Sequence, residues 1–422
     1  MRFLHRVALV AACLGLVVSL PVAAQPEPKR QPTARRDPRP VDDPDWMFEV
    51  LERVREKYHV PSLSAAVLID GRVVAASAAG RRKADDPTPV KRTDRYLIGS
   101  VSKPITATLI SVLVEKGVLS FDDTLEKMFP ELADTMHPDY RMATVAQLLA
   151  HTAGLPYQPT KHESHERFKD LEVAVKNRYE YVKNALADKG VAKPGEKFEY
   201  SGGAVIAAHY AERLTKKPVE ELLEEHVYRP LGWAGTDHVN VTSGLDQVDG
   251  PWPHDLTDGK LIPRPPHGEH GKSRLPVGGV CCSMTDLARL LGTHLPQPKS
   301  PYPGTRLLKA ETLKRLHAVQ PPGSSTMSWY PSGADWTREL VLWHSGSTGG
   351  WFCLAHLVPG EGYATCVAVN ANGKDCDQAC QQAHLELVKR VPRLRERAAA
   401  NWGAFPPDRV PPDRVPARPP GR

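Results

Sequence analysis

The sequence lacks any concentrated stretch of positive charge and any long apolar run after its first 24 residues. It has 55 Lys and Arg against 49 Asp and Glu, and the net charge of +6 is spread along all 422 residues. An excess this dispersed disfavours nucleic acid as a partner. At roughly 100 to 200 residues per domain, the length allows two or three lobes, which excludes fibrous proteins and disulfide-only mini-folds.

Several motifs of hydrolases and metalloproteins are also missing. No G-x-S-x-G is present, so an α/β-hydrolase is excluded. The histidine clusters at residues 162–165 and 267–270 lack H-E-x-x-H spacing, and no paired C-x-x-C occurs. We therefore expect no metal ion and no organic cofactor. No repeat of about 20 to 50 residues is visible, which disfavours solenoids and propellers.

Proline is the residue in excess, with 40 copies, about twice the average usage. Residues 25–44 combine prolines with arginines, and the pentapeptide PPDRV occurs twice within residues 403–422. Such segments keep the backbone extended and solvated. We therefore predict a disordered linker over 25–44 and a disordered tail over 403–422.

The first 24 residues have the pattern of an export signal. Two arginines and no acid precede an apolar stretch over residues 7–20, and small residues allow cleavage after Ala24. A permanent anchor needs about 20 uninterrupted apolar residues, and this stretch is shorter and broken by Pro21. We predict a periplasmic or secreted protein with no membrane-spanning segment after cleavage. Lipid attachment at Cys13, in a loose lipoprotein box, is a less favoured alternative.

The loss of Cys13 leaves six cysteines, and thiols in an oxidising compartment tend to pair. Six cysteines allow 15 connectivities. The spacing suggests that Cys353 and Cys366 face each other across a hairpin and that Cys376 and Cys380 bridge one helical turn. The six residues are Cys281, Cys282, Cys353, Cys366, Cys376 and Cys380.

The apolar pattern predicts an α/β core that is interrupted by helices. Residues 46–58 have helical spacing, and residues 63–69 and 73–79 predict a hairpin with a type I′ turn at Asp70-Gly71. A strand-like segment over 95–99 leads to a helix start. Further helices are predicted over 145–149, 171–186, 203–214, 218–227, 286–291 and 378–391, a long loop over 245–275, and strands over 340–344, 350–358 and 363–371.

This order of elements predicts two structural parts. Strands at both ends with helices between them indicate an α/β domain built from residues 45–110 and 276–395. Residues 111–275 form a mainly helical insertion in this prediction.

Residues 100–103 form the only S-x-x-K motif in the chain. Residues three apart at a helix start lie on one face, so Lys103 can reach the Ser100 hydroxyl. A partly desolvated lysine can lose its proton near neutral pH and act as the base for a serine nucleophile. The alternative is a serine that caps the helix beside a solvated lysine, and the tetrapeptide alone favours that alternative.

Two later segments favour the chemical interpretation. Residues 194–203 place Tyr200 on a tight loop before a helix, where its phenol could share proton transfer with Lys103. Residues 342–350 are a strand edge followed by small residues, where backbone N–H groups can approach an oxyanion. In isolation these segments are more typical of a satisfied tyrosine hydroxyl and a glycine-rich bend.

Five segments that occur in order along the chain carry a family resemblance. They are IGSVSKP at 98–104, QLLAHTAGLP at 147–156, residues 194–202, PVGGV at 276–280 leading into DLAR at 286–289, and HSG at 344–346. Together they resemble the serine β-lactamase and penicillin-binding-protein superfamily. The similarity is to the branch that holds class C β-lactamases, D-alanyl-D-alanine carboxypeptidases, D-aminopeptidases and related esterases. It implies the β-lactamase/transpeptidase-like fold, an antiparallel sheet flanked by helices with an inserted helical domain.

The resemblance implies three catalytic residues. Ser100 would be the acylated nucleophile, and Lys103 would be its hydrogen-bonded base. Tyr200 would protonate the leaving group and help to activate the deacylating water. The segment at residues 151–154 would have a structural role, packing the helical insertion.

The resemblance also implies a substrate-binding strand. His344, Ser345 and Gly346 correspond to the family's K-T-G strand. The backbone N–H groups of Ser347 and of the nucleophile would form the oxyanion hole, in which each donor is typically worth about 10²- to 10³-fold in rate.

Two positions depart from the family pattern. Gly202 stands at a substrate-binding position where the family usually has asparagine, so it cannot donate a side-chain amide to a substrate carbonyl or hold Lys103. His344 replaces the lysine of efficient β-lactamases. Histidine at that place also occurs in peptidase and esterase members, so the resemblance favours cleavage of an amide or ester over antibiotic hydrolysis.

The sequence therefore predicts an exported serine hydrolase that acts through an acyl-enzyme on Ser100. Its substrate would be a small molecule or short peptide, with D-amino-acid peptides, cell-wall peptides, small esters and β-lactams as candidates. The alternative is a catalytically silent protein of the same fold that serves as an envelope binding or sensor module.

Overall fold

The computed structural model describes residues 44–161, 171–233, 247–257, 260–266, 272–296, 306–323 and 325–401. The predicted signal, nearly all of the predicted linker, the C-terminal tail and both histidine clusters lie outside the described residues. Within the described segments, no helix combines the length and the apolar character needed to cross a membrane.

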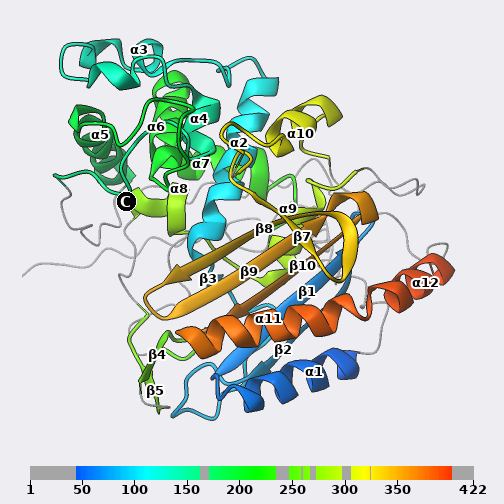
Figure 1. The fold of residues 1–422 in the computed structure, drawn as a ribbon. Helices are drawn as coiled ribbons and strands as arrows, with labels where there is room; N and C mark the ends of the chain where they lie inside the picture. Colours follow the sequence, from blue (N-terminus) through cyan, green and yellow to red (C-terminus); the bar gives the residue numbers. More distant parts are fainter. Residues whose placement is uncertain are drawn as a thin grey trace, which may run out of the picture. The chain divides into compact units, whose positions relative to one another are not determined.

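A six-stranded antiparallel sheet forms the centre of the α/β part (Figure 1). The predicted hairpin is confirmed, because β1 and β2 are joined by Asp70 and Gly71, whose φ values of 48° and 79° are those of a type I′ turn. The antiparallel sheet, together with the helices that pack on it, confirms the predicted fold class. In sheet order the strands are β2 (Arg72–Gly80), β1 (Ser62–Ile69), β10 (Tyr363–Val369), β9 (Trp351–Val358), β8 (Thr337–Thr348) and β7 (Tyr330–Ala334).

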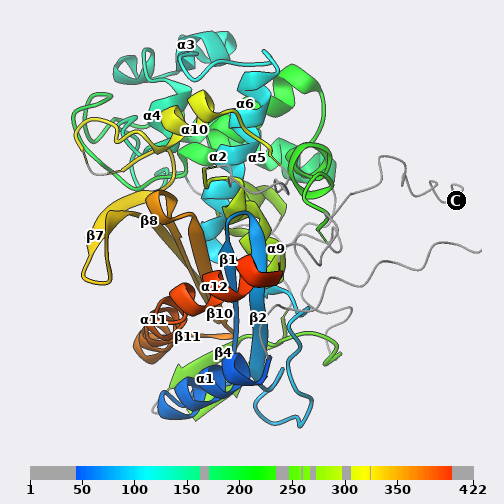
Figure 2. The same cartoon turned by 90° about the vertical axis from the view of Figure 1, so that its right-hand side faces the viewer.

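Helices cover both faces of this sheet (Figures 1 and 2). On one face α1 (Pro44–Lys57) packs on β2, and α11 (Lys374–Val388) packs on β10. The chain continues from α11 into α12 (Val391–Asn401). Leu394 of α12 belongs to the buried apolar cluster that α1 and α11 form with this face of the sheet. On the other face α9 (Met284–Gly292) packs on β1 and β10. Both faces of the sheet are thus buried, which explains why β1, β9 and β10 are buried at every position.

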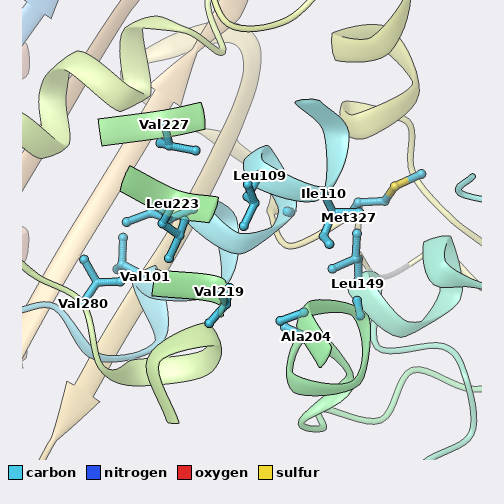
Figure 3. Close-up of a cluster of buried hydrophobic side chains, with 14 of the residues drawn as sticks. Val101, Leu109, Ile110, Leu149, Ala204, Val219, Leu223, Val227, Val280 and Met327 are labelled. Carbon is cyan, nitrogen blue, oxygen red and sulfur yellow. The ribbon is translucent and has the colours of Figure 1, made fainter. Parts of the chain in front are cut away.

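The helical part is built around α2 (Ser102–Glu115), which is buried along most of its length. Its side chains Leu109 and Ile110 lie in a cluster with residues from several other helices (Figure 3). Because neighbouring helices enclose α2, the residues at its start are held in place by packing. The other helices are α3 (Leu125–Met128), α4 (Val145–Leu149), α5 (Leu171–Ala187), α6 (Gly203–Thr215), α7 (Val219–Leu223) with the π-turn η4 (Glu224–Tyr228), α8 (Leu275–Gly278) and α10 (Ala310–His317), and the 3₁₀ turns are η1 (Gly99–Val101), η2 (Pro130–Leu132), η3 (Pro138–Tyr140), η5 (Lys272–Arg274) and η6 (Pro359–Glu361).

The predicted long loop over residues 245–275 is wrong in part. It contains β4 (His254–Thr257) and β5 (Lys260–Pro263), which form a small sheet with β11 (Ala371–Asn372). β4 pairs antiparallel with the adjacent β5 and parallel with the distant β11. The hairpin of β4 and β5 is local, and the Asp-Gly pair at residues 258–259 of the sequence is a turn signal that the loop prediction overlooked. The pairing with β11 has no local signal. A second pair, β3 (Tyr96–Leu97) with β6 (Cys281–Cys282), joins the segment before Ser100 to the PVGGV region.

The predicted disulfides are not present. Cys353, Cys366, Cys376 and Cys380 are buried free thiols, as is Cys282. Cys353 and Cys366 lie on neighbouring strands but two positions out of register, and such diagonal side chains are about 7–8 Å apart, too far for a disulfide. Cys376 and Cys380 share the buried face of α11. Cβ atoms four residues apart on a helix are about 5–6 Å from each other, which is more than the Cβ separation of a disulfide.

Candidate active site

Ser100 lies in the 3₁₀ turn η1, between strand β3 and helix α2. Gly99 adopts a φ of 53°, which a glycine tolerates without strain. The neighbouring Ser102 fixes this turn from inside, because its Oγ donates to the Gly99 carbonyl at 2.7 Å and accepts from the Val280 N–H at 3.1 Å. The motif at 276–280 thus supports the turn that presents Ser100.

Lys103 is almost completely buried beside Ser100. Its Nζ lies 3.2 Å from Ser100 Oγ, 2.6 Å from Tyr200 Oη and 3.0 Å from the Val277 carbonyl oxygen. Burial, followed by the nearby charge of Arg274, lowers the pKa of Lys103 to about 7. A large fraction of the molecules therefore carries a neutral amine at physiological pH, which can accept a proton.

Tyr200 completes the contact between the three predicted catalytic side chains. Its hydroxyl donates to Ser100 Oγ at 2.7 Å. Burial raises the pKa of Tyr200 to about 12, against a smaller lowering effect of the Ser100 hydrogen bond. The phenol is therefore protonated at neutral pH and can give a proton to a leaving group.

His151 positions the loop that carries Tyr200. Its ring packs on the Tyr200 ring with centroids 4.6 Å apart, and its Nδ1 accepts from the Ser201 N–H at 3.1 Å. The His151 carbonyl also accepts from the Glu199 N–H at 2.8 Å. These contacts agree with the predicted structural role of this segment and extend it to the loop that carries Tyr200. No pattern around residue 151 predicts this contact, because it joins His151 to a loop about 50 residues further along the chain.

Strand β8 runs against the Ser100 turn, and two glycines allow this close approach. A Cβ on Gly346 would lie 1.9 Å from the Ile98 oxygen and 2.7 Å from the Ser100 nitrogen, and one on Gly99 would lie 2.9 Å from the Ser347 nitrogen. The backbone nitrogens of Ser100 and Ser347 therefore flank one backbone contact. Both N–H groups therefore lie close enough to the nucleophile to be candidates for the oxyanion hole that the resemblance implies.

Gly346→Ala is expected to lower kcat/KM for an ester about 10²- to 10³-fold, because the methyl group must push β8 away from the Ser100 turn. The matched control is Gly333→Ala on the neighbouring strand β7, where nothing lies within 4 Å of the added Cβ. Ester hydrolysis and the melting temperature should be measured for both variants. Wild-type kcat/KM in Gly346→Ala would contradict the proposed arrangement.

His344 lies in β8 and is buried, and it does not line the pocket at Ser100. Its Nδ1 donates to the Ser345 carbonyl at 2.7 Å. Burial, together with the charge of Lys103, lowers the pKa of His344 to about 3. It is therefore neutral at physiological pH and supplies no positive charge, unlike the lysine that the resembling β-lactamases have there.

Tyr181 occupies the space beside Gly202, because a Cβ there would lie 2.0 Å from the hydroxyl oxygen of Tyr181, which would have to move to admit a side chain. Tyr181 comes from α5 and fills the space that an asparagine side chain would need. Lys103 is held instead by Ser100, Tyr200 and the Val277 carbonyl.

A pocket of about 240 Å³ opens at Ser100. This volume is below the roughly 300–1,000 Å³ of sites for drug-sized ligands, so it suits a small substrate or the end of a peptide. Of the predicted site residues, Ser100, Lys103, Tyr200, Gly202 and Ser347 line it, whereas the three residues at 344–346 do not.

Two further residues, Tyr181 and Arg274, line the pocket, and no motif in the sequence predicts either of them as a site residue. Tyr181 lies in the middle of a helical pattern, and Arg274 lies in what reads as a loop. Among the described residues, no group of three or more His, Cys, Asp or Glu side chains is arranged to hold a metal ion.

Residues 47–389 match the Beta-lactamase family. The chain belongs to this family. Among curated relatives, Penicillin-binding protein 4 of Amycolatopsis lactamdurans is 26% identical over 358 residues, covering 78% of this chain and 86% of that protein. The family assignment agrees with the resemblance derived from the five motifs.

Two solved structures show the same fold as this Beta-lactamase family chain. The octameric penicillin-binding protein homologue from Pyrococcus abyssi has a TM-score of 0.64 at 22% identity, covering 82% of this chain and 78% of that chain. The D-amino acid amidase from Ochrobactrum anthropi in complex with L-phenylalanine has a TM-score of 0.64 at 17% identity, covering 82% and 99%.

Proposed function

We propose that this protein is a serine hydrolase that cleaves an amide or ester through an acyl-enzyme on Ser100. One observation carries the proposal: the Ser100 hydroxyl, the Lys103 amine and the Tyr200 phenol are in mutual hydrogen-bond contact at the mouth of a pocket. A nucleophile within reach of a base, itself oriented by a third group, is the general signature of covalent catalysis.

In acylation, neutral Lys103 takes the proton of Ser100 as Oγ bonds to the substrate carbonyl carbon. The carbonyl oxygen becomes negative and is stabilised by the backbone N–H groups of Ser100 and Ser347. When the bond to the leaving group breaks, Tyr200 gives its phenolic proton to that group. The Lys103 ammonium then returns a proton to Tyr200 across their 2.6 Å hydrogen bond, so the acyl-enzyme has the starting protonation states.

Deacylation uses the same groups in reverse. Water attacks the ester carbonyl of the acyl-enzyme and loses a proton to Lys103, with Tyr200 orienting and relaying. The Ser100 oxygen then leaves and takes the proton from Lys103. No step needs a group that the described residues do not supply.

The proposed substrates are small amides and esters rather than β-lactam antibiotics. The neutral state of His344 supports this choice, because the strand offers no cation in the place of the family lysine. The likeness to a D-amino acid amidase in fold adds D-amino-acid amides to the panel to be tested. If the chain is exported as we predict, cell-wall peptides are within its reach.

Two acylating probes test the proposal on the full-length protein. A fluorophosphonate and a fluorescent penicillin should be incubated with folded protein, and the labelled peptide should be mapped. We expect fluorophosphonate label on the peptide that contains residue 100. Folded protein that takes no label from either probe would favour the silent binding or sensor module instead.

The pKa of Lys103 near 7 predicts a pH dependence. The neutral amine is the base, so kcat/KM for an uncharged ester should rise with pH, with a one-proton midpoint at about 7. Tyr200, with its pKa of about 12, stays protonated above that midpoint, so the curve should reach a plateau. His344 and His151, whose pKa values burial lowers, should not titrate in this window. A flat or falling curve between pH 5 and 9 would argue against Lys103 as the base.

A further inference from the structure

Arg274 lines the pocket and stands two residues before the family segment at 276–280. It comes from the 3₁₀ turn η5, which packs on helix α5. The pocket lining also contains Tyr181 and Asn177 from α5. Arg274 is half-buried and contributes atoms to the pocket lining.

Arg274 differs from the other buried arginines in having no acidic partner among the described residues. Arg82 forms a hydrogen-bonded ion pair with Asp94 at 2.6 Å, and Arg178 contacts two glutamates. The electrostatic neighbours of Arg274 are Tyr181 and Tyr157. Burial lowers the pKa of Arg274. A guanidinium that is partly withdrawn from water needs an acceptor, and the pocket is the space left for one.

The pocket as a whole favours an anion. Its described lining contains no aspartate or glutamate and three basic residues, Arg274, Lys103 and Arg178, of which Arg178 is neutralised by its glutamate partners. The charge of Arg274 reaches Lys103, where it contributes to the lowered pKa. A bound carboxylate would give the guanidinium of Arg274 the acceptor that it lacks among the described residues.

Tyr181 adds a neutral donor beside Arg274. Its hydroxyl lies against Gly202, at the position that the absent asparagine side chain would occupy. Burial raises the pKa of Tyr181 to about 12, so the phenol keeps its proton and can donate it. A planar guanidinium and a phenol together can hold the two oxygens of one carboxylate.

We propose that Arg274 and Tyr181 form a subsite for a carboxylate in the acyl part of the substrate, the part that becomes attached to Ser100, so that the preferred amides and esters have an anionic acyl group. The inference rests on the proposed hydrolase and names its substrate class as anionic amides or esters. The small pocket requires that the carboxylate belong to the substrate itself rather than to a large neighbouring group.

A pair of matched esters tests the subsite. Phenyl hydrogen adipate has an acyl part that ends in a carboxylate, and in methyl phenyl adipate this carboxylate is capped. We expect wild-type protein to prefer the anionic ester, and Arg274→Gln to lower the anionic-to-neutral ratio of kcat/KM by on the order of 10- to 100-fold. The ratio cancels any effect of Arg274 on the base Lys103.

Two further variants show whether the effect belongs to the subsite. Arg274→Lys, which keeps the charge but loses the planar fork, should retain part of the preference. Arg92→Gln removes an exposed arginine that does not line the pocket and should leave the ratio unchanged.

A binding measurement separates this inference from the proposed function. Calorimetric titration of the full-length protein with hexanoate and hexanamide needs no turnover. We expect hexanoate to bind more tightly than hexanamide, and Arg274→Gln to weaken hexanoate at least about 10-fold. Hexanoate binding without any hydrolysis or fluorophosphonate label would support the subsite and refute the hydrolase. Equal affinity for the two ligands in the wild type, with an unchanged ester ratio in Arg274→Gln, would overturn the subsite.

Discussion

Ser100→Ala should lower the rate of ester or amide hydrolysis on the order of 10³- to 10⁶-fold. The reason is that Oγ is the atom that forms the covalent bond, and neither Lys103 nor Tyr200 can replace it. Residual catalysis from oriented backbone N–H groups and substrate binding sets the floor of this loss. The measurement is kcat/KM with a phenyl ester at pH 8, where Lys103 is largely neutral.

The Ser100→Ala variant should remain folded. Lys103 and Tyr200 keep their direct contact of 2.6 Å, so the free energy of unfolding should change by about 1 kcal/mol or less. Thermal unfolding is the control. A folded Ser100→Ala protein that retains wild-type kcat/KM would place the chemistry on another residue.

Lys103→Met should lower acylation by about 10²- to 10⁴-fold, which is the usual contribution of a positioned base. Methionine has a similar length and removes a buried amine that is difficult to protonate. It also leaves the Val277 carbonyl without its 3.0 Å donor. Removal of the buried amine should stabilise the fold, whereas loss of the donor to the Val277 carbonyl should destabilise it. We therefore expect a small net change in the free energy of unfolding beside the large loss of rate.

The pH profile of Lys103→Met distinguishes a base from a merely structural lysine. Its residual kcat/KM should no longer rise through pH 7, because the group that titrates there is gone. Conversely, a rise at pH 7 that persists in the variant would assign the titration to another group. Lys116→Met, at the C-terminal end of α2, is a matched control that removes a lysine remote from the pocket.

Much of the fold could be predicted from local patterns. The hairpin is predicted because Asp70-Gly71 is a strong turn signal between apolar runs, and the structure contains it. Helices α5 and α6 begin at the predicted residues. In these elements the side-chain pattern and the tertiary surroundings favour the same conformation.

Some strands are absent from the prediction although their partners are local. β4 and β5 form a hairpin, and only β4 also pairs with the distant β11. β7 pairs with the adjacent β8 at the sheet edge, although its own sequence contains proline and glycine, which are unfavourable signals for a strand. The register of β9 and β10, set by the turn between them, decides that Cys353 and Cys366 are diagonal. One-residue detail of this kind is not visible in cysteine spacing.

The candidate site divides in the same way. Ser100, Lys103 and Tyr200 were identified through motifs that a family resemblance connects, and the structure brings them into contact. Tyr181 and Arg274 act from a helix and a turn with ordinary sequence patterns, so only the three-dimensional structure places them at the pocket. The residues that determine substrate choice are therefore the least predictable part.

Intact-mass analysis of the wild-type protein, after brief incubation with a panel of D-amino-acid amides, phenyl esters and a penicillin, tests the central claim most directly. We predict that at least one amide or ester adds the mass of its acyl part alone, on the peptide containing Ser100, and that this mass disappears with time. Folded protein that gains no mass from any member of the panel, or gains it at a different residue, would contradict the acyl-enzyme account.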